Sequence, residues 1–99
     1  MPAYVIVETE VHDPLQYSEY QAASPDAVHS GDGRFIARGG ELAVLEGDWS
    51  PSRLVVLEFA DLEAAKRWYD SPQYQEAKRL REGAANLRMV AVQGLDEPL

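Results

Sequence analysis

The hydrophobic and polar positions of this 99-residue chain define four short segments with strand-like patterns. Residues 4–11 are apolar on both faces at first and then alternate, which is typical of a strand in the middle of a covered sheet. Residues 53–59 are apolar on both faces along most of their length and form the clearest predicted strand. The two remaining predicted strands are residues 34–38 and 87–92.

Capping residues mark the helices between these strands. Asp13–Pro14 supplies an N-cap followed by a proline at the first helical position, where the missing N–H costs nothing. A second pair of this kind, Ser24–Pro25, predicts that the first helix stops and restarts there. Asp61 predicts the start of another helix, and Ser71–Pro72 predicts that it is capped again and continued.

The middle of the chain is rich in glycine. Gly39–Gly40 is expected to interrupt the strand at 34–38 as a bulge or a turn. Residues 42–46 are then predicted to resume as a strand or hairpin arm, and residues 47–51 are expected to form a loop.

The order strand, helix, strand, strand, helix, strand is typical of a ferredoxin-like α+β domain, βαββαβ with an antiparallel four-stranded sheet. We expect a single domain at residues 1–95 and a short acidic tail at 96–99. In this layout the helices cover one face of the sheet. Because three strands are apolar on both faces, we predict that the other face packs on a second copy, which gives a homodimer.

The charge balance narrows the choice of partners. The chain has 17 acidic and 9 basic residues, a net charge of -8, and no cysteine. An acidic surface does not neutralise phosphates, so we expect no nucleic-acid partner and no docking on anionic membranes. No apolar run is long enough for a membrane span, and the N-terminus lacks a signal-peptide pattern. The lack of cysteine excludes thiolate chemistry and is compatible with the cytoplasmic location that we expect.

Arg38 is the first candidate for a ligand contact. The first half of the chain has only two basic residues, and Arg38 is one of them. It stands directly before Gly39, so its guanidinium is suited to a carboxylate while bare backbone approaches the ligand. The structural alternative is that the glycines form a bulge and that Arg38 pairs with an acid such as Glu46 or Glu58.

Three residues are weak candidates for acid–base catalysis. Glu58 stands in an otherwise apolar strand, and Glu8 occupies the matching point of the first strand. If the two strands are neighbours, the carboxylates lie near each other in one cleft, where they raise each other's proton affinity. The plainer alternative is that one or both bind Arg53 or Arg38. His12 shares the strand face of Glu8, but alternate strand residues are too far apart for a good metal site, so we expect no metal and no cofactor.

Trp68 and Tyr20 are the aromatic candidates. Trp68 lies on the apolar face of its predicted helix, which favours a core position over a place in a ligand-binding wall. Tyr20 is expected on the opposite helix, with its phenol available for a hydrogen bond to a ligand. Trp49, in a loop, is expected to be exposed and to pack across the dimer.

A set of motifs spreads over almost the whole chain. The most specific is Trp-Tyr-x-Ser-Pro-x-Tyr at residues 68–74. It is accompanied by the strand at 3–6, Tyr17, Tyr20, Arg38–Gly40, Leu45–Gly47, Arg53, Leu57–Phe59, Ala65, Lys78 and Arg81. Over about residues 2–94 the chain resembles the bacterial family known as domain of unknown function 1330. The resemblance implies ferredoxin-like protomers packed sheet to sheet as a dimeric α+β barrel.

The sequence thus leaves three functional hypotheses open. The leading one is a homodimer that binds a small organic molecule in a cleft between helices and sheet, with Arg38, Gly39, Tyr20, Glu58 and Trp68 as contacts. The second is a cofactor-independent enzyme, similar to the monooxygenases or isomerases of the same superfamily, acting on a small aromatic or carboxylated substrate. The third is a non-catalytic interaction or stress module. Likeness of fold does not choose among them.

Overall fold

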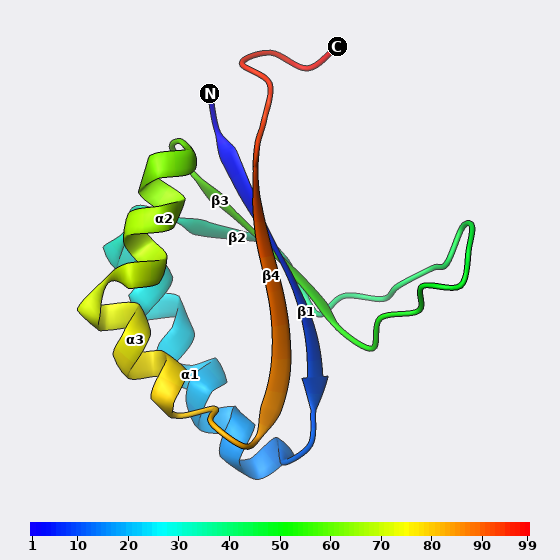
Figure 1. The fold of residues 1–99 in the computed structure, drawn as a ribbon, viewed down its shortest axis with the longest axis vertical. Helices are drawn as coiled ribbons and strands as arrows, with labels where there is room; N and C mark the ends of the chain where they lie inside the picture. The colour runs from blue at the N-terminus through cyan, green and yellow to red at the C-terminus, as the bar shows by residue number, and fades with distance from the viewer.

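The computed structural model describes residues 1–99 as a four-stranded antiparallel sheet with three helices on one of its faces (Figure 1). The elements are β1 (Ala3–Val11), α1 (Pro14–Ser30), β2 (Arg34–Arg38), β3 (Leu54–Phe59), α2 (Leu62–Asp70), α3 (Pro72–Arg79) and β4 (Ala85–Gln93). The strand order is β2-β3-β1-β4. The predicted ferredoxin-like α+β fold is therefore confirmed.

The register of the sheet sends alternate side chains of β1 to opposite faces. Val5 of β1 stands between Leu57 of β3 and Ala91 of β4. The odd-numbered residues of β1 from Ala3 to Thr9 face the helices and are buried, whereas Ile6 and its even-numbered neighbours lie half-buried on the other face. We call this second face, which no helix covers, the open face.

An aromatic cluster joins the helices to the sheet. The ring of Trp68 on α2 lies 5.0 Å from that of Phe59 on β3 and 4.4 Å from that of Tyr74 on α3. Tyr20 of α1 meets Tyr74 edge to face at 6.4 Å. All four side chains are buried, so they form the centre of the core between the two layers.

Three of the four predicted helix caps are confirmed. The side chains of Asp13, Asp61 and Ser71 accept hydrogen bonds from backbone amides three residues later, at 3.1, 2.7 and 3.1 Å. No helix in the structure combines the length and the apolar character needed to cross a membrane.

The predicted break in the first helix at Ser24–Pro25 is wrong, because α1 runs without interruption through Pro25. A proline inside a helix has no N–H to donate to the carbonyl four residues earlier, which here belongs to Gln21. The guanidinium of Arg38 supplies the missing donor, since its Nη2 donates to the Gln21 carbonyl at 2.6 Å. Arg38 thus connects β2 to α1.

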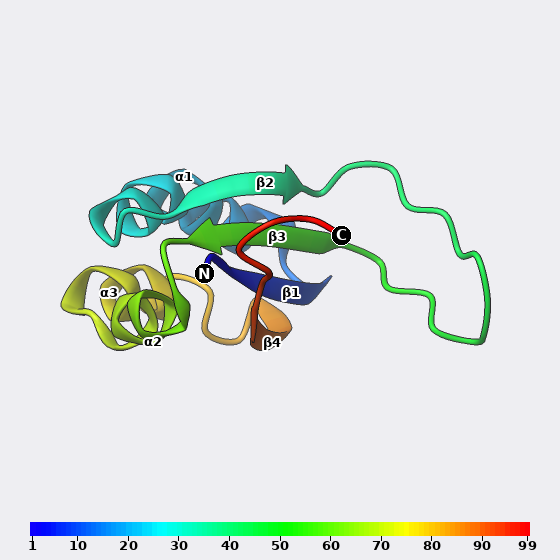
Figure 2. The ribbon, with the colours of Figure 1, turned by 90° about the horizontal axis from the view of Figure 1, so that it is seen from above.

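Residues 39–53 form a long excursion between β2 and β3, which we call the arm. The arm extends well away from the two layers (Figure 2). The prediction of a strand at 42–46 is wrong, because these residues have no regular secondary structure. Leu42, Val44 and Leu45 are exposed, and their backbone takes part in no hydrogen bond. The predicted strand irregularity occurs three residues earlier than expected, as a bulge at Ile36.

Gly33 provides a test of how closely the start of β2 packs on the core. A Cβ atom at Gly33 would lie 2.4 Å from Cε1 of Phe59, whereas one at Gly40 would meet nothing within 4 Å. We therefore expect Gly33→Ala to lower the free energy of unfolding by about 1–3 kcal/mol through overpacking, as measured by urea denaturation. Gly40→Ala is the matched control and should change it by less than about 0.5 kcal/mol. Equal effects of the two substitutions would contradict this account of the packing.

Candidate functional site

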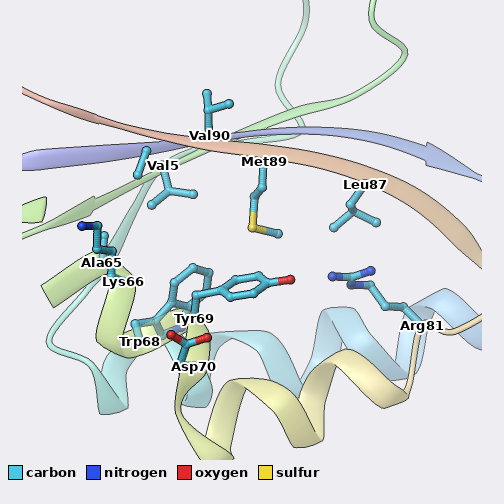
Figure 3. Close-up of a pocket in the computed structure, with 11 residues that line it drawn as sticks. Val5, Ala65, Lys66, Trp68, Tyr69, Asp70, Arg81, Leu87, Met89 and Val90 are labelled. Carbon is cyan, nitrogen blue, oxygen red and sulfur yellow. The ribbon is translucent and has the colours of Figure 1, made fainter. Parts of the chain in front are cut away.

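A cleft of about 390 Å³ lies between α2 and β4 (Figure 3). Its walls are mainly apolar, and they include the buried ring of Trp68. The lining residues are Val5, Ala65, Lys66, Trp68, Tyr69, Asp70, Arg81, Leu87, Met89, Val90 and Ala91. A volume of this size is within the usual range for small-molecule sites, which is roughly 300–1,000 Å³.

One end of the cleft is polar and positively charged. Figure 3 shows the hydroxyl of Tyr69 pointing toward the guanidinium of Arg81, below the side chains of Leu87 and Met89. The ammonium group of Lys78 donates a hydrogen bond to the Tyr69 hydroxyl at 3.0 Å. Two cationic groups and a phenol therefore meet where the apolar walls end.

Arg81 is held by tyrosines and not by an acid. Its Nη2 donates to the Tyr74 hydroxyl at 3.1 Å, and its guanidinium lies 5.3 Å from the ring centroid of Tyr20. Its Nε is buried and has no hydrogen-bond partner. Burial by itself lowers the pKa of Arg81, but the hydroxyls of Tyr74 and Tyr20 raise it above its ordinary value overall. The half-buried group therefore keeps its charge.

The guanidinium of Arg81 has no carboxylate partner. Arg34, Lys66, Arg79 and Arg88 each lie within 4.0 Å of a carboxylate, whereas Arg38, Arg53, Arg67, Lys78 and Arg81 do not. The chain has 17 acidic residues, so a shortage of carboxylates does not explain this distribution. The three arginines that line the cleft or the inner space beside it, Arg38, Arg53 and Arg81, are thus all without a carboxylate partner.

A second, smaller space lies between α1 and the centre of the sheet, and we call it the inner pocket. Its volume is about 30 Å³, and it shares Trp68, Leu87 and Met89 with the cleft. The polar residues of its lining are Thr9, Tyr17, Tyr20, Gln21, Ser24, Arg38 and Arg53.

The structure gives Arg38 and Gly39 specific local roles. Arg38 lines the inner pocket, where it binds the Gln21 carbonyl and lies 4.7 Å from the ring of Phe35. Gly39 has a φ of +68°, and a Cβ atom there would lie 2.1 Å from Nη1 of Arg53. The close approach expected at Gly39 therefore occurs, but the group that approaches is the Arg53 guanidinium.

The predicted proximity of Glu8 and Glu58 is wrong. Glu58 pairs with Tyr4 in the register of the sheet, so the two carboxylates are about 13 Å apart along β1. Both lie on the open face, where Glu58 binds Arg34 and Glu8 binds Arg88. Each is therefore neutralised by an arginine, though not by Arg38 or Arg53 as the alternative hypothesis assumed.

Glu8 also accepts a hydrogen bond from the indole N–H of Trp49 at 2.9 Å. This bond and the one from Arg88 lower the pKa of Glu8 below its ordinary value. The predicted exposure of Trp49 is confirmed, and its ring lies at the base of the arm next to the open face.

His12 lies at the end of β1, away from the cleft. Its ring Nε2 is 3.4 Å from a Glu10 oxygen and 3.0 Å from Nδ2 of Asn86. No group of three or more histidine, aspartate or glutamate side chains is arranged to hold a metal ion.

Two of the sequence-derived candidates belong to the walls of these spaces. Trp68 is a core residue, 3 % exposed, which confirms the favoured core interpretation, and it also lines both the cleft and the inner pocket. Tyr20 lines the inner pocket, and its hydroxyl is bonded to that of Tyr74 at 3.0 Å. The sequence analysis did not single out a role for Arg81, although it belongs to the motifs that carry the family resemblance.

The family model described as "Domain of unknown function (DUF1330)" matches residues 2–95. The chain belongs to this family. A search of curated proteins finds no significant match. The fold of this DUF1330 protein recurs in solved structures of low sequence identity, which show likeness of fold alone.

Three of these structures are informative. A protein of unknown function from Rhodopseudomonas palustris has a TM-score of 0.74 and 18% identity, covering 97% of this chain and 84% of its own. A dimeric ferredoxin-like protein of unknown function from Jannaschia sp. CCS1 has a TM-score of 0.68 and 15% identity, covering 95% of this chain and 100% of its own. SnoaB, a cofactor-independent oxygenase from Streptomyces nogalater, has a TM-score of 0.67 and 12% identity, covering 97% of this chain and 95% of its own.

The buried phenol of Tyr20 makes the stability of the protein depend on alkaline pH. Burial, with the neighbouring Tyr74 hydroxyl, raises the pKa of Tyr20 well above its ordinary value of 10.0. Stability from the neutral phenol is therefore complete below about pH 10 and falls as the pH rises further, because the unfolded chain loses the proton first. We expect a loss of about 1 kcal/mol between pH 10 and pH 11.

Tyr20→Phe should remove that part of the loss, since the Tyr74 hydroxyl keeps its bond to Arg81. The measurement is urea denaturation of both proteins at about pH 8.5, 10 and 11. An identical alkaline slope in the two proteins would show that Tyr20 is not the group responsible.

Proposed function

We propose that this protein binds a small organic anion, a carboxylate with a flat apolar body, in the cleft between α2 and β4. The observation that carries the proposal is the charged, half-buried guanidinium of Arg81 at the end of an apolar cleft with no carboxylate against it. A desolvated cation without a counter-ion is costly, and a bound carboxylate would offset that cost.

The walls of the cleft support an aromatic ligand body. The rings of Trp68 and Tyr69 lie 6.2 Å apart at an angle of 70°, so they form two sides of a corner. Met89 faces this corner from β4 (Figure 3). A thioether is flexible and polarizable and packs well against aromatic rings, so this wall adapts to ligands of different outline.

The free hydrogen-bonding groups support a carboxylate at the other end. The unpartnered Nε of Arg81 is a donor, and the Tyr69 hydroxyl is held in place by Lys78. Asp70 is the only carboxylate in the lining, which contains no histidine. The proposal is therefore one of binding, and it assigns no proton transfer to the cleft.

The test compares carboxylates with the amides of the same shape. Calorimetric titration with benzoate and 1-naphthoate, and with benzamide and 1-naphthamide, isolates the contribution of the charge. We expect the carboxylates to bind and the amides to bind at least tenfold more weakly, because each charge-assisted hydrogen bond contributes roughly 1.5–3 kcal/mol.

Arg81→Met should weaken carboxylate binding at least tenfold and bring it close to that of the amides. Arg67→Met is the matched control, since Arg67 is exposed, has no ion pair and does not line the cleft. Carboxylate binding that survives Arg81→Met unchanged would remove Arg81 from the site. A failure of all four compounds to bind would count against the proposal as a whole.

We also propose that the open face of the sheet packs on the open face of a second copy. Val90 and Val92 of β4 are 65% and 49% exposed, and Ile6 and Val56 lie half-buried beside them. The solved structure from Jannaschia sp. CCS1 is described as dimeric, which supports a dimer here. Burial of these side chains against their own copies is the simplest way to remove such a patch from water.

Light scattering should therefore give the mass of a dimer at about 10 µM. Val90→Glu places a charge in the middle of the face and should give a monomer. Leu15→Glu is the control, because Leu15 is 85% exposed on α1, away from the sheet, and its substitution should leave the dimer intact. A monomeric wild-type protein would overturn this part of the proposal.

A further inference from the structure

The inner pocket contains a buried hydroxyl that no other group satisfies. Thr9 is 1% exposed, and its Oγ1 has no hydrogen-bond partner. The backbone of the same residue is fully paired, since its N–H donates to the Arg53 carbonyl at 3.0 Å and its carbonyl accepts from Ser52 at 2.9 Å. The position of Thr9 is thus fixed, and Thr9 lines the inner pocket with a hydroxyl that lacks a partner.

Arg53 presents an unpartnered donor to the same pocket. Its Nε is buried without a hydrogen-bond partner, and Arg53 has no carboxylate within ion-pair distance. The other end of its guanidinium packs against Gly39, where the absence of a side chain gives it room. This contact holds the guanidinium in place, so that its Nε remains at the pocket.

Arg38 adds a second positive charge at the exposed side of the pocket. Its guanidinium is held by the Gln21 carbonyl and the Phe35 ring. The lining of the inner pocket therefore contains two arginines and no aspartate or glutamate. In a chain of net charge -8, this local excess of positive charge favours the entry of an anion.

The size of the pocket limits the anion. A single water needs roughly 10–15 Å³ of such space, so the 30 Å³ present here accommodate one or two water-sized groups. An aromatic ring does not fit, which separates this pocket from the cleft on the other side of Met89.

We propose that the inner pocket binds a small monovalent anion, of the size of a halide or formate. The hydroxyl of Thr9 and the Nε–H of Arg53 donate to the anion, and Arg38 closes the exposed side. The site is distinct from the one proposed for the aromatic ligand, because Arg38 and Arg53 line it in place of Arg81, although the two spaces share Trp68, Leu87 and Met89. A water molecule in the same place would satisfy the two donors, but it would not make stability depend on the anion.

The test follows thermal unfolding at one ionic strength in sodium gluconate, sodium chloride and sodium formate. Gluconate is too large for the pocket and serves as the reference anion. We expect the unfolding midpoint of the wild-type protein to rise with chloride or formate concentration relative to gluconate, since a ligand of the folded state stabilises it.

Two substitutions locate the effect. Thr9→Val keeps the shape of the side chain but removes the hydroxyl, so the rise with chloride or formate should fall by at least half, while stability in gluconate stays equal or increases. Arg53→Gln should abolish the rise. Arg67→Gln should retain it, as a control for net charge.

If Arg53→Gln does not fold, the unfolding midpoints of Thr9→Val and the wild type in the three salts still test the proposal. Midpoints of the wild-type protein that coincide in all three salts would mean that the pocket holds only water. The proposal is falsified if Thr9→Val responds to chloride and formate like the wild type. Crystals grown in bromide give the direct check, with an anomalous peak expected within hydrogen-bonding distance of Thr9 Oγ1.

Discussion

The structure depends on one constraint, which is that all three helices lie on the same face of the sheet. The aromatic cluster of Phe59, Trp68, Tyr74 and Tyr20 can then fill only the space between the two layers. These large rings do not fill the interior completely. The two spaces that they leave are the cleft and the inner pocket, and Trp68 and Met89 line both. The same constraint leaves the second face of the sheet without cover.

The sheet also sorts the arginines of the chain. Arg34 and Arg88 point to the open face and are neutralised there by Glu58 and Glu8. On the helix side, Arg81 donates to the Tyr74 hydroxyl and Arg53 packs against Gly39, and neither has a carboxylate within ion-pair distance. The side of the sheet on which these four arginines lie thus decides whether a carboxylate pairs with them.

The sequence predicted the fold well because strand patterns and helix caps are local signals. Asp13, Asp61 and Ser71 cap helices as expected, since each needs only an amide three residues away. The candidate site was predicted less well. The partner of Glu8 depends on the register between β1 and β4, which brings Arg88 beside it from 80 residues away, and no local pattern contains that information. Arg81 is one of the motif residues, but nothing in the sequence indicates that it lies at the end of a cleft.

The continuation of α1 through Pro25 has a consequence for the solubility of the sheet. β2 is an edge strand, and an exposed edge is a template on which other chains can add strands and aggregate. The carbonyl that Pro25 leaves free holds Arg38, so the end of β2 is tied to the helix layer, while the bulge at Ile36 disrupts the regular edge. Pro25 removes one hydrogen bond from α1, but it thereby helps to protect the β2 edge of the sheet from strand addition by other chains.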